Sequence, residues 1–224
     1  MKPKLVTFDV YMALLNIQGS LTPIVAEALN MDAGAATDFV RTWRATQMAC
    51  AAASNALGRG HTPFRDCTRL GLDYALTRHG VDLPDANRDH LVGSWDALHP
   101  WPEAVSVVAE IKRRGYVTAI LSNGDQAMLD AVAIHFGEAM DHVLSVETAG
   151  MYKPHPAVYA LPAECLGVAR EDTLHVAGGA NDVLGAVAFG IPCYWSNRAG
   201  DVVIDRQFDA DHQGSDLSGV LDIL

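Results

Sequence analysis

The sequence has little of several features that mark particular classes of protein. Its four cysteines, Cys50, Cys67, Cys165 and Cys193, are scattered singly, so neither the CxxC spacing of a metal site nor a disulfide framework is present, and we expect reduced thiols. Basic residues are scarce, with 16 Lys and Arg against 27 Asp and Glu and a formal net charge of -11, so we do not expect binding to nucleic acid or to an anionic membrane. No apolar run approaches the ~18 residues of a membrane span, and an acid at Asp9 precedes any signal-like stretch, so we expect a cytoplasmic protein.

What the chain does have is a strand-and-helix alternation. Half of its 224 residues are hydrophobic, enough for a buried core. Lys4 to Phe8 is a short apolar run that stops at Asp9, as a buried parallel strand would. After residue 100 we expect strands over 117–121, 143–146, 173–176 and 191–195, and helices over 104–114, 126–135, 156–166 and 182–189. This alternation predicts a parallel sheet covered on both faces.

The segment between the first strand and residue 100 has a different character. Helical spacing covers 21–29, 33–57, 65–79 and 88–98, with no convincing strand. The sequence therefore predicts an α/β fold in two parts: a parallel-sheet core of residues 1–15 and 99–224, and an all-helical cap of residues 16–98. A cap inserted after the first strand should lie over the strand ends, where it can exclude water.

Polar residues follow four of the expected strands. They are Asp9, Ser122-Asn123, Lys153 and Asp182. Because the carboxyl ends of parallel strands share one edge of a sheet, we expect these side chains to converge there. A carboxylate fixed at a strand end can attack an electrophilic centre and leave an ester or acyl phosphate for water to cleave. A single acid at such a position more often caps the next helix, but four polar sites together favour chemistry.

These residues carry a resemblance to a known family. The motifs are Phe8-Asp9-Val10-Tyr11, Leu121-Ser122-Asn123-Gly124, Tyr152-Lys153-Pro154, and Asp182-Val183-Leu184-Gly185-Ala186 followed by Phe189-Gly190-Ile191-Pro192. In this order, with a helical insertion after the first, they resemble the four motifs of the haloacid dehalogenase superfamily over nearly the whole chain. The resemblance implies a Rossmann-like core with a helical cap, in agreement with the periodicity.

The residue two places after Asp9 indicates a branch of the superfamily. Its phosphatases carry a second Asp there, which protonates the leaving group and helps to hold Mg²⁺, whereas this chain has Tyr11. Mg²⁺ prefers near-octahedral oxygen ligands, and the segment 177–182 offers only one carboxylate. A metal-dependent phosphoryl transferase is therefore disfavoured, and we expect no metal and no other cofactor.

The Asp-x-Tyr form resembles the metal-independent L-2-haloacid dehalogenases. Further similar segments are Trp43-Arg44 with Gln47, Gly58-Arg59 followed by Phe64, Tyr159, and Trp195-Ser196-Asn197-Arg198-Ala199-Gly200. The resemblance implies Asp9 as nucleophile on the carbon that bears the halogen, Lys153 paired with Asp182, Ser122 holding the substrate carboxylate, and Arg44, Asn123 and Phe64 as the leaving-group cradle. Tyr11, Tyr159 and Asn181 complete the candidate binding residues. The substrate implied is a small carboxylic acid.

Elementary chemistry agrees with these roles. A departing halide needs no proton, so Tyr11 can stand where phosphatases have an acid, and a fixed guanidinium stabilises growing negative charge at a dry site. Lys153 should keep Asp9 ionised by proximity. The structural alternatives are Arg44 as a solvated helix residue, Phe64 as cap core and Tyr159 as a packing residue.

Two segments depart from the dehalogenase pattern. Met12-Ala13 replaces the expected Gly-Thr, and residues 177–181 read Ala177-Gly178-Gly179-Ala180-Asn181 where the dehalogenases have Ser-Ser-Asn-Ala-Trp. The Ser and Asn that help to place the hydrolytic water in that family are therefore missing. Asn181, Asn16 and His155 are candidate substitutes, although His155, the one histidine of nine beside a motif, fits better as a helix cap.

Several functional hypotheses follow. The first is a dehalogenase with altered machinery for its second step. The others are the same Asp9 displacement on another small carboxylate, such as ring opening of azetidine-2-carboxylate, a degenerate member that binds without turnover, and a phosphatase. The Ala-rich face from Ala45 to Ala56 can pack within the cap or across a homodimer, and both stay open.

Overall fold

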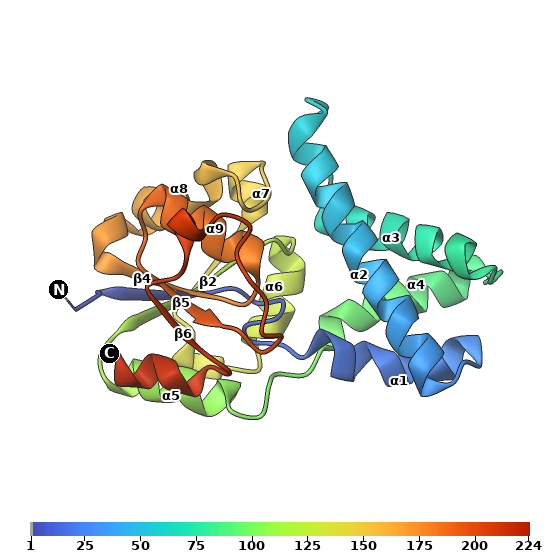
Figure 1. Cartoon of the computed structure of the whole chain (residues 1–224), viewed down its shortest axis with the longest axis horizontal. Coiled ribbons are helices and arrows are strands. Elements are labelled where there is room, and N and C mark those ends of the chain that lie inside the picture. The colour runs from blue at the N-terminus through green and yellow to red at the C-terminus, as the bar shows by residue number, and fades with distance from the viewer. Residues whose placement is uncertain (1) are drawn as a thin grey trace. The chain divides into compact units, whose positions relative to one another are not determined.

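The computed structural model describes residues 2–224, which form two compact units (Figure 1). One unit contains the chain up to Leu15 together with Pro100–Leu224, and the other contains Asn16–His99. We call them the core unit and the cap unit and describe each by itself. None of the helices in the described residues is both long enough and apolar enough to cross a membrane.

The core unit is built on a six-stranded parallel sheet. The strands are β1 Leu5–Phe8, β2 Val117–Ser122, β3 His142–Ser145, β4 Thr173–Ala177, β5 Cys193–Ser196 and β6 His212–Gly214, in the order β3-β2-β1-β4-β5-β6. The central strands β1 and β4 are buried along their whole length, as expected for a parallel sheet that is covered on both faces. The order reverses direction at β1, and ligands of such sheets bind at the carboxyl ends beside this point.

Helices cover both faces of this sheet. They are α5 Ala104–Arg113, α6 Gln126–Ala133, the short α7 Val146–Ala149, α8 Pro156–Leu166 and α9 Ala180–Phe189. Figure 1 shows α8 and α9 on one face and α5 on the other. The helix α9 begins three residues after β4 ends, so its first turn lies at the carboxyl edge of the sheet. The predicted Rossmann-like parallel sheet with helices around it is confirmed.

The register of β1, β4 and β5 places three side chains in one row. Thr7 of β1 lies opposite His175 of β4, and His175 lies opposite Cys193 of β5. Aligned positions of parallel strands point to the same face of a sheet. This is the face that α8 and α9 cover, because His175 contacts Tyr159 of α8 and Asp182 of α9.

Most predicted elements differ from the structure only by a few residues at their ends, and two differences concern the kind of element. Val146, expected to end a strand, begins the short helix α7, because Ser145 accepts a hydrogen bond from the Glu147 N–H and caps a helix start there. The strand β6 at 212–214 was not predicted. It has only three residues, two of them exposed, so it carries no apolar pattern.

The cap unit is helical, with α1 Ile17–Leu29, α2 Ala33–Ala56, α3 Phe64–His79, α4 Asp85–Gly93 and a 3₁₀ turn over Ser94–Ala97. Asn16 and Asp32 cap α1 and α2 with their side chains. The helices α2 and α3 approach closely at Gly71, where a Cβ would lie 3.0 Å from the carbonyl oxygen of Trp43. Glycine at this position therefore lets the two backbones approach each other.

Candidate active site

Asp9 and Ser122 meet where β1 and β2 end. The Asp9 backbone N–H donates to the Val176 carbonyl at 2.9 Å, which continues the β1–β4 ladder to the nucleophile position. The Ser122 hydroxyl donates to Asp9 Oδ1 at 3.2 Å and accepts from the Val10 N–H at 3.4 Å. Asp9 is only 8% exposed. Its carboxylate is therefore fixed by the sheet and by a hydroxyl from the neighbouring strand.

Lys153 joins the two carboxylates of the site. Its ammonium lies 2.9 Å from Asp182 Oδ2 and 3.4 Å from Asp9 Oδ1. Its backbone N–H donates to Asn123 Oδ1 at 2.9 Å, so the asparagine that follows β2 fixes the loop that carries the lysine. The Asn123 amide group, with its oxygen used in this way, presents its N–H₂ as the remaining donor.

Asp182 accepts hydrogen bonds on both of its carboxylate oxygens. Oδ1 accepts from the Tyr159 hydroxyl at 2.8 Å, while Oδ2 faces Lys153 and His175, each at 2.9 Å. Burial alone would raise the pKa of Asp182, but the neighbouring His175 and Lys153 outweigh burial, and the pKa lies well below its ordinary value. Burial and the nearby Asp182 charge raise the pKa of Tyr159, which keeps the phenol protonated as a donor.

His175 is part of this site, although the sequence analysis assigned no role to it. The side chain is fully buried, with Nδ1 2.8 Å from the Thr7 hydroxyl and Nε2 2.9 Å from Asp182 Oδ2. The signal that could have found it is a lone histidine in the apolar run of β4, Thr-Leu-His-Val-Ala. A buried imidazole needs partners for both nitrogens, and the row across β1 and β4 supplies them.

The other predicted site residues of the core unit differ in where their side chains lie. Tyr11 is buried, and its hydroxyl lies so close to Gly124 that a Cβ there would be 2.8 Å away. Tyr159 points its hydroxyl at Asp182 rather than into open space, so in this structure it positions a carboxylate. Asn181 is exposed and makes no hydrogen bond to the cluster, because the first turn of α9 turns Asp182 inward and its neighbour outward.

The candidate water-activating residues outside α9 act as helix caps. Asn16 accepts from the Gly19 N–H at the start of α1, and His155 accepts from the Ala157 N–H at the start of α8. The expectation that His155 caps a helix is therefore confirmed.

The segments that depart from the dehalogenase pattern contact each other. Met12 has a φ of 90°, a left-handed conformation that a non-glycine residue adopts at a cost of about 1–3 kcal/mol. A Cβ on Gly178 would lie 2.3 Å from the Ala13 backbone nitrogen. The Met12-Ala13 turn thus occupies the space that a side chain at position 178 would need.

In the cap unit, Arg44 and Phe64 form a second group. The Arg44 guanidinium lies 5.9 Å from the ring centre of Phe64 and 5.7 Å from that of Trp95, and it donates to Gln47 Oε1. Gln47 in turn donates to the Thr68 hydroxyl at 2.6 Å. Two of the three residues predicted as a leaving-group cradle, Arg44 and Phe64, are thus brought together, and the guanidinium also lies near the Trp95 ring.

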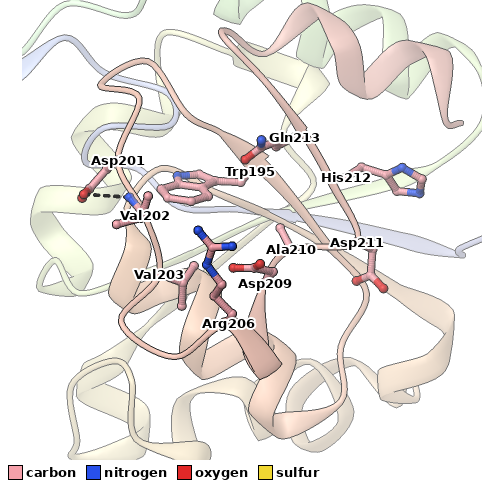
Figure 2. A pocket seen from close by; sticks show the side chains of 10 residues that line it. All are labelled: Trp195, Asp201, Val202, Val203, Arg206, Asp209, Ala210, Asp211, His212 and Gln213. Atoms are coloured by element: carbon pink, nitrogen blue, oxygen red, sulfur yellow. Dashed lines mark hydrogen bonds between the residues drawn. The ribbon is translucent and has the colours of Figure 1, made fainter.

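Two other features of the described residues bear on where chemistry can occur. Among residues 2–224, no group of three His, Cys, Asp or Glu side chains is arranged to hold a metal ion. A cavity of about 350 Å³ lies beside β5 and β6 and is lined by Trp195 and by residues between Asp201 and Gln213 (Figure 2). Its titratable residues, such as Arg206 and His212, are exposed, and none belongs to the cluster around Lys153.

The cluster around Lys153 is suited to nucleophilic chemistry. Asp9 presents a buried carboxylate oxygen held by a hydroxyl and an ammonium, and the lysine charge is shared with a second carboxylate that stays ionised. A carboxylate so fixed can form an ester with an electrophilic carbon.

Comparison with known proteins gives consistent results. Residues 3–190 match the model of a family described as haloacid dehalogenase-like hydrolase. An (S)-2-haloacid dehalogenase of Pseudomonas sp. (strain YL) is 31% identical over 220 residues, covering 97% of this chain and 93% of that protein. One from Xanthobacter autotrophicus is 33% identical over 193 residues, covering 84% and 72%.

Solved structures agree with the sequence relatives. The crystal structure of an L-2-haloacid dehalogenase superposes with a TM-score of 0.92 at 27% identity, covering 100% of this chain and 99% of that one. The Xanthobacter autotrophicus L-2-haloacid dehalogenase with chloropropionic acid covalently bound superposes with a TM-score of 0.86 at 25% identity, covering 100% and 98%.

Proposed function

This chain belongs to the haloacid dehalogenase-like hydrolases, and on that premise we propose that it hydrolyses short (S)-2-haloalkanoic acids to the 2-hydroxy acids of inverted configuration. The observation that carries the proposal is Asp9 itself, whose buried Oδ1 is held by Ser122 and Lys153 at the switch point of the sheet. The dehalogenase relatives favour this reaction over ring opening of a cyclic amino acid.

The first step is a displacement at carbon. An Asp9 oxygen attacks C2 of the substrate, the carbon–halogen bond breaks, and halide leaves with its electron pair, so an aspartyl ester forms with inversion at C2. Lys153 keeps Asp9 ionised, and Asp182 holds Lys153. Ser122 has a hydroxyl that can also reach the substrate carboxylate.

The second step regenerates the enzyme. Water attacks the side-chain carbonyl carbon of the Asp9 ester, the bond between that carbon and the ester oxygen breaks, and the 2-hydroxy acid leaves. The net reaction consumes one water and releases one halide and one proton. Because inversion occurs only in the first step, the (S)-halide gives the (R)-hydroxy acid.

The leaving-group roles of Asn123, Arg44 and Phe64 remain part of this proposal. The Asn123 N–H₂ and the Arg44 guanidinium are donors suited to a developing halide, and the Phe64 ring offers an apolar wall. Arg44→Lys keeps the charge but loses the planar fork, so we expect a lower rate of halide release with an unchanged fold.

The direct assay is chloride release from (S)-2-chloropropionate in the presence of EDTA. We expect release of chloride, (R)-lactate as the product, and no turnover of the (R) enantiomer. Magnesium-dependent hydrolysis of p-nitrophenyl phosphate without chloride release would instead support a phosphatase. Opening of azetidine-2-carboxylate without chloride release would support the second sequence-based hypothesis. The cytoplasmic location and the homodimer also remain predictions, for cell fractionation and light scattering to test.

A further inference from the structure

The reaction proposed above leaves one buried imidazole without a role. His175 is fully buried, and both of its ring nitrogens have close partners. Nδ1 lies 2.8 Å from the Thr7 hydroxyl, while Nε2 lies 2.9 Å from Asp182 Oδ2 and 3.4 Å from the Lys153 ammonium. The imidazole is therefore one side chain away from the nucleophile, with Lys153 between.

The partners of His175 indicate where its proton lies. Two acceptors would repel each other at 2.9 Å, so with Asp182 ionised a hydrogen must lie between Nε2 and Oδ2. The neutral imidazole then accepts from the Thr7 hydroxyl through Nδ1. If the ring gains a proton, Nδ1 becomes the donor, and the Thr7 hydroxyl can turn toward the Leu174 carbonyl at 3.5 Å. Thr7 can thus accommodate both states.

His175 and Lys153 share a single oxygen. Both donate to Asp182 Oδ2, while Tyr159 takes Oδ1. The groups that face the imidazole are Thr7 from β1, Lys153 from its loop, Tyr159 from α8 with its ring 6.0 Å away, Asp182 from α9, and Cys193 opposite on β5. Burial raises the pKa of the Cys193 thiol, which stays protonated.

We propose, resting on the function above, that His175 is a positioning residue: it fixes the Asp182 oxygen that holds Lys153, so the charge on the imidazole sets how strongly the Lys153 ammonium is drawn toward Asp9. With a neutral imidazole, Asp182 holds Lys153 and leaves Asp9 as a reactive carboxylate. With a charged imidazole, Asp182 is already neutralised and Lys153 meets a like charge 3.4 Å away. Lys153 then pairs more closely with Asp9, which becomes a weaker nucleophile.

The test is the pH profile of the first step. Single-turnover halide release from (S)-2-chloropropionate is measured for the wild type, His175→Gln and His175→Leu. The rate is measured between about pH 5 and pH 8, and we expect the wild-type rate to fall toward the acid end because the imidazole gains a proton. Glutamine keeps an N–H donor near the position of Nε2 but does not titrate, so in H175Q this fall should move to lower pH by at least about one unit. Its plateau should stay within about tenfold of the wild type.

The leucine variant separates the effect of the hydrogen-bond donor from the effect of side-chain volume. H175L keeps an apolar side chain without a donor, so we expect kcat to fall by about 10²-fold while KM changes less than about twofold. A purely structural role for His175 lowers the plateau in H175Q but leaves the fall at the same pH. That outcome, or a wild-type profile that is flat across pH 5–8, overturns the proposal.

Thr7 offers a graded variant on a neighbouring strand. Thr7→Val removes the hydroxyl that accepts a hydrogen bond from a charged imidazole. Loss of this partner costs a buried charged imidazole more free energy than it costs a neutral one. We therefore expect the fall in T7V to move to lower pH, while Thr7→Ser keeps the wild-type profile. Equal profiles for T7V and T7S contradict the proposed network.

An NMR titration separates this proposal from the proposed function. The His175 signals, assigned by their loss in H175Q, should show a neutral Nε2–H form. In Lys153→Met the imidazole should take up its proton at higher pH, because a like charge 3.4 Å away is gone. A wild type that releases no halide refutes the proposed function, whereas a His175 titration that is the same in K153M refutes the coupling whatever the activity.

Discussion

The cluster around Lys153 and the cavity beside β5 and β6 contain the same kinds of side chain in very different surroundings. Both combine aspartates, a basic residue and a histidine, and both lie in the core unit. In the cluster, Asp9, Lys153 and Asp182 are each 8% exposed and His175 is fully buried. In the cavity, the titratable residues are all exposed, and Asp201 accepts from the Val202 N–H of its own loop (Figure 2).

This difference shows what turns ordinary charged residues into a site. Water screens the exposed charges of the cavity, so their interactions are weak. In the buried cluster, each ionised group is stabilised by its partners instead of by water. Removal of one partner therefore leaves another charge buried alone. We therefore expect substitutions in the cluster to have large effects and matched substitutions in the cavity to have small ones.

The largest expected effect is on catalysis through Asp9. Asp9→Asn keeps the shape of the side chain but removes the nucleophilic charge, so we expect the rate of halide release to fall by about 10³-fold or more. The measurement is steady-state chloride release with (S)-2-chloropropionate. The matched variant Asp209→Asn in the cavity should stay within about twofold of the wild type. Activity retained in D9N contradicts the assignment of the nucleophile.

The next effect concerns Lys153. Lys153→Met removes the ammonium beside Asp9 and Asp182, and we expect kcat to fall by about 10²–10³-fold, as for other lost electrostatic donors. The variant should also be less stable by about 3–5 kcal/mol in urea unfolding, because Asp182 is left buried with fewer partners. Arg206→Met, its counterpart in the cavity, should change neither quantity by a measurable amount. Similar losses in both variants would remove the distinction between the two regions.

A third effect is the pH dependence of stability. The pKa of Asp182 is lower in the folded chain than in an unfolded one, so its ionised form stabilises the fold above about pH 4, and this stabilisation is lost as pH falls through the acid range. Asp182→Asn should therefore flatten the dependence of the unfolding free energy on pH between about pH 2 and 5. Asp209→Asn, at an exposed aspartate of the cavity, should leave the wild-type slope. An unchanged slope in D182N contradicts the paired state of Asp182.

The smallest expected effect is a steric one beside the cluster. In Gly178→Ala the new Cβ would lie 2.3 Å from the Ala13 backbone nitrogen, so we expect a loss of about 1–3 kcal/mol in the free energy of unfolding. In Gly179→Ala the Cβ meets only Met12 Sδ at 3.7 Å, and we expect a change below about 1 kcal/mol. Urea unfolding of the pair measures this difference. Equal stabilities would show that the Met12-Ala13 turn moves aside freely.

The sequence predicts most strands and helices of this molecule well, because their buried residues recur at the spacing typical of each element. Lys4 to Phe8 is a mainly apolar run that ends at Asp9, Thr173 to Val176 is a short run that ends shortly before two glycines, and the structure places strands at both. The convergence of Asp9, Ser122 and Lys153 could be predicted because each lies at or after the end of a strand of the parallel sheet. A three-residue edge strand such as β6 has too little pattern to be predicted.

The parts that sequence reasoning missed depend on register and on contacts distant in the chain. His175 belongs to the site because β1 and β4 align it with Thr7 and because α9 folds back over it, and neither fact is local in sequence. Asn181 is exposed because helical geometry turns it away from its neighbour Asp182. The sequence can predict that a helix is present, but the direction of each side chain in its first turn depends on which face of the helix packs against the sheet.

The central claim is that Asp9 bonds covalently to substrate carbon, and a single turnover in H₂¹⁸O tests it most directly. With enzyme in excess over (S)-2-chloropropionate, mass spectrometry of the peptide that contains Asp9 and of the lactate shows where the label goes. We expect ¹⁸O in the Asp9 carboxylate and an unlabelled hydroxyl in the lactate, because water attacks the aspartyl ester. Labelled lactate with an unlabelled Asp9 would mean direct attack of water on the substrate and would contradict the account.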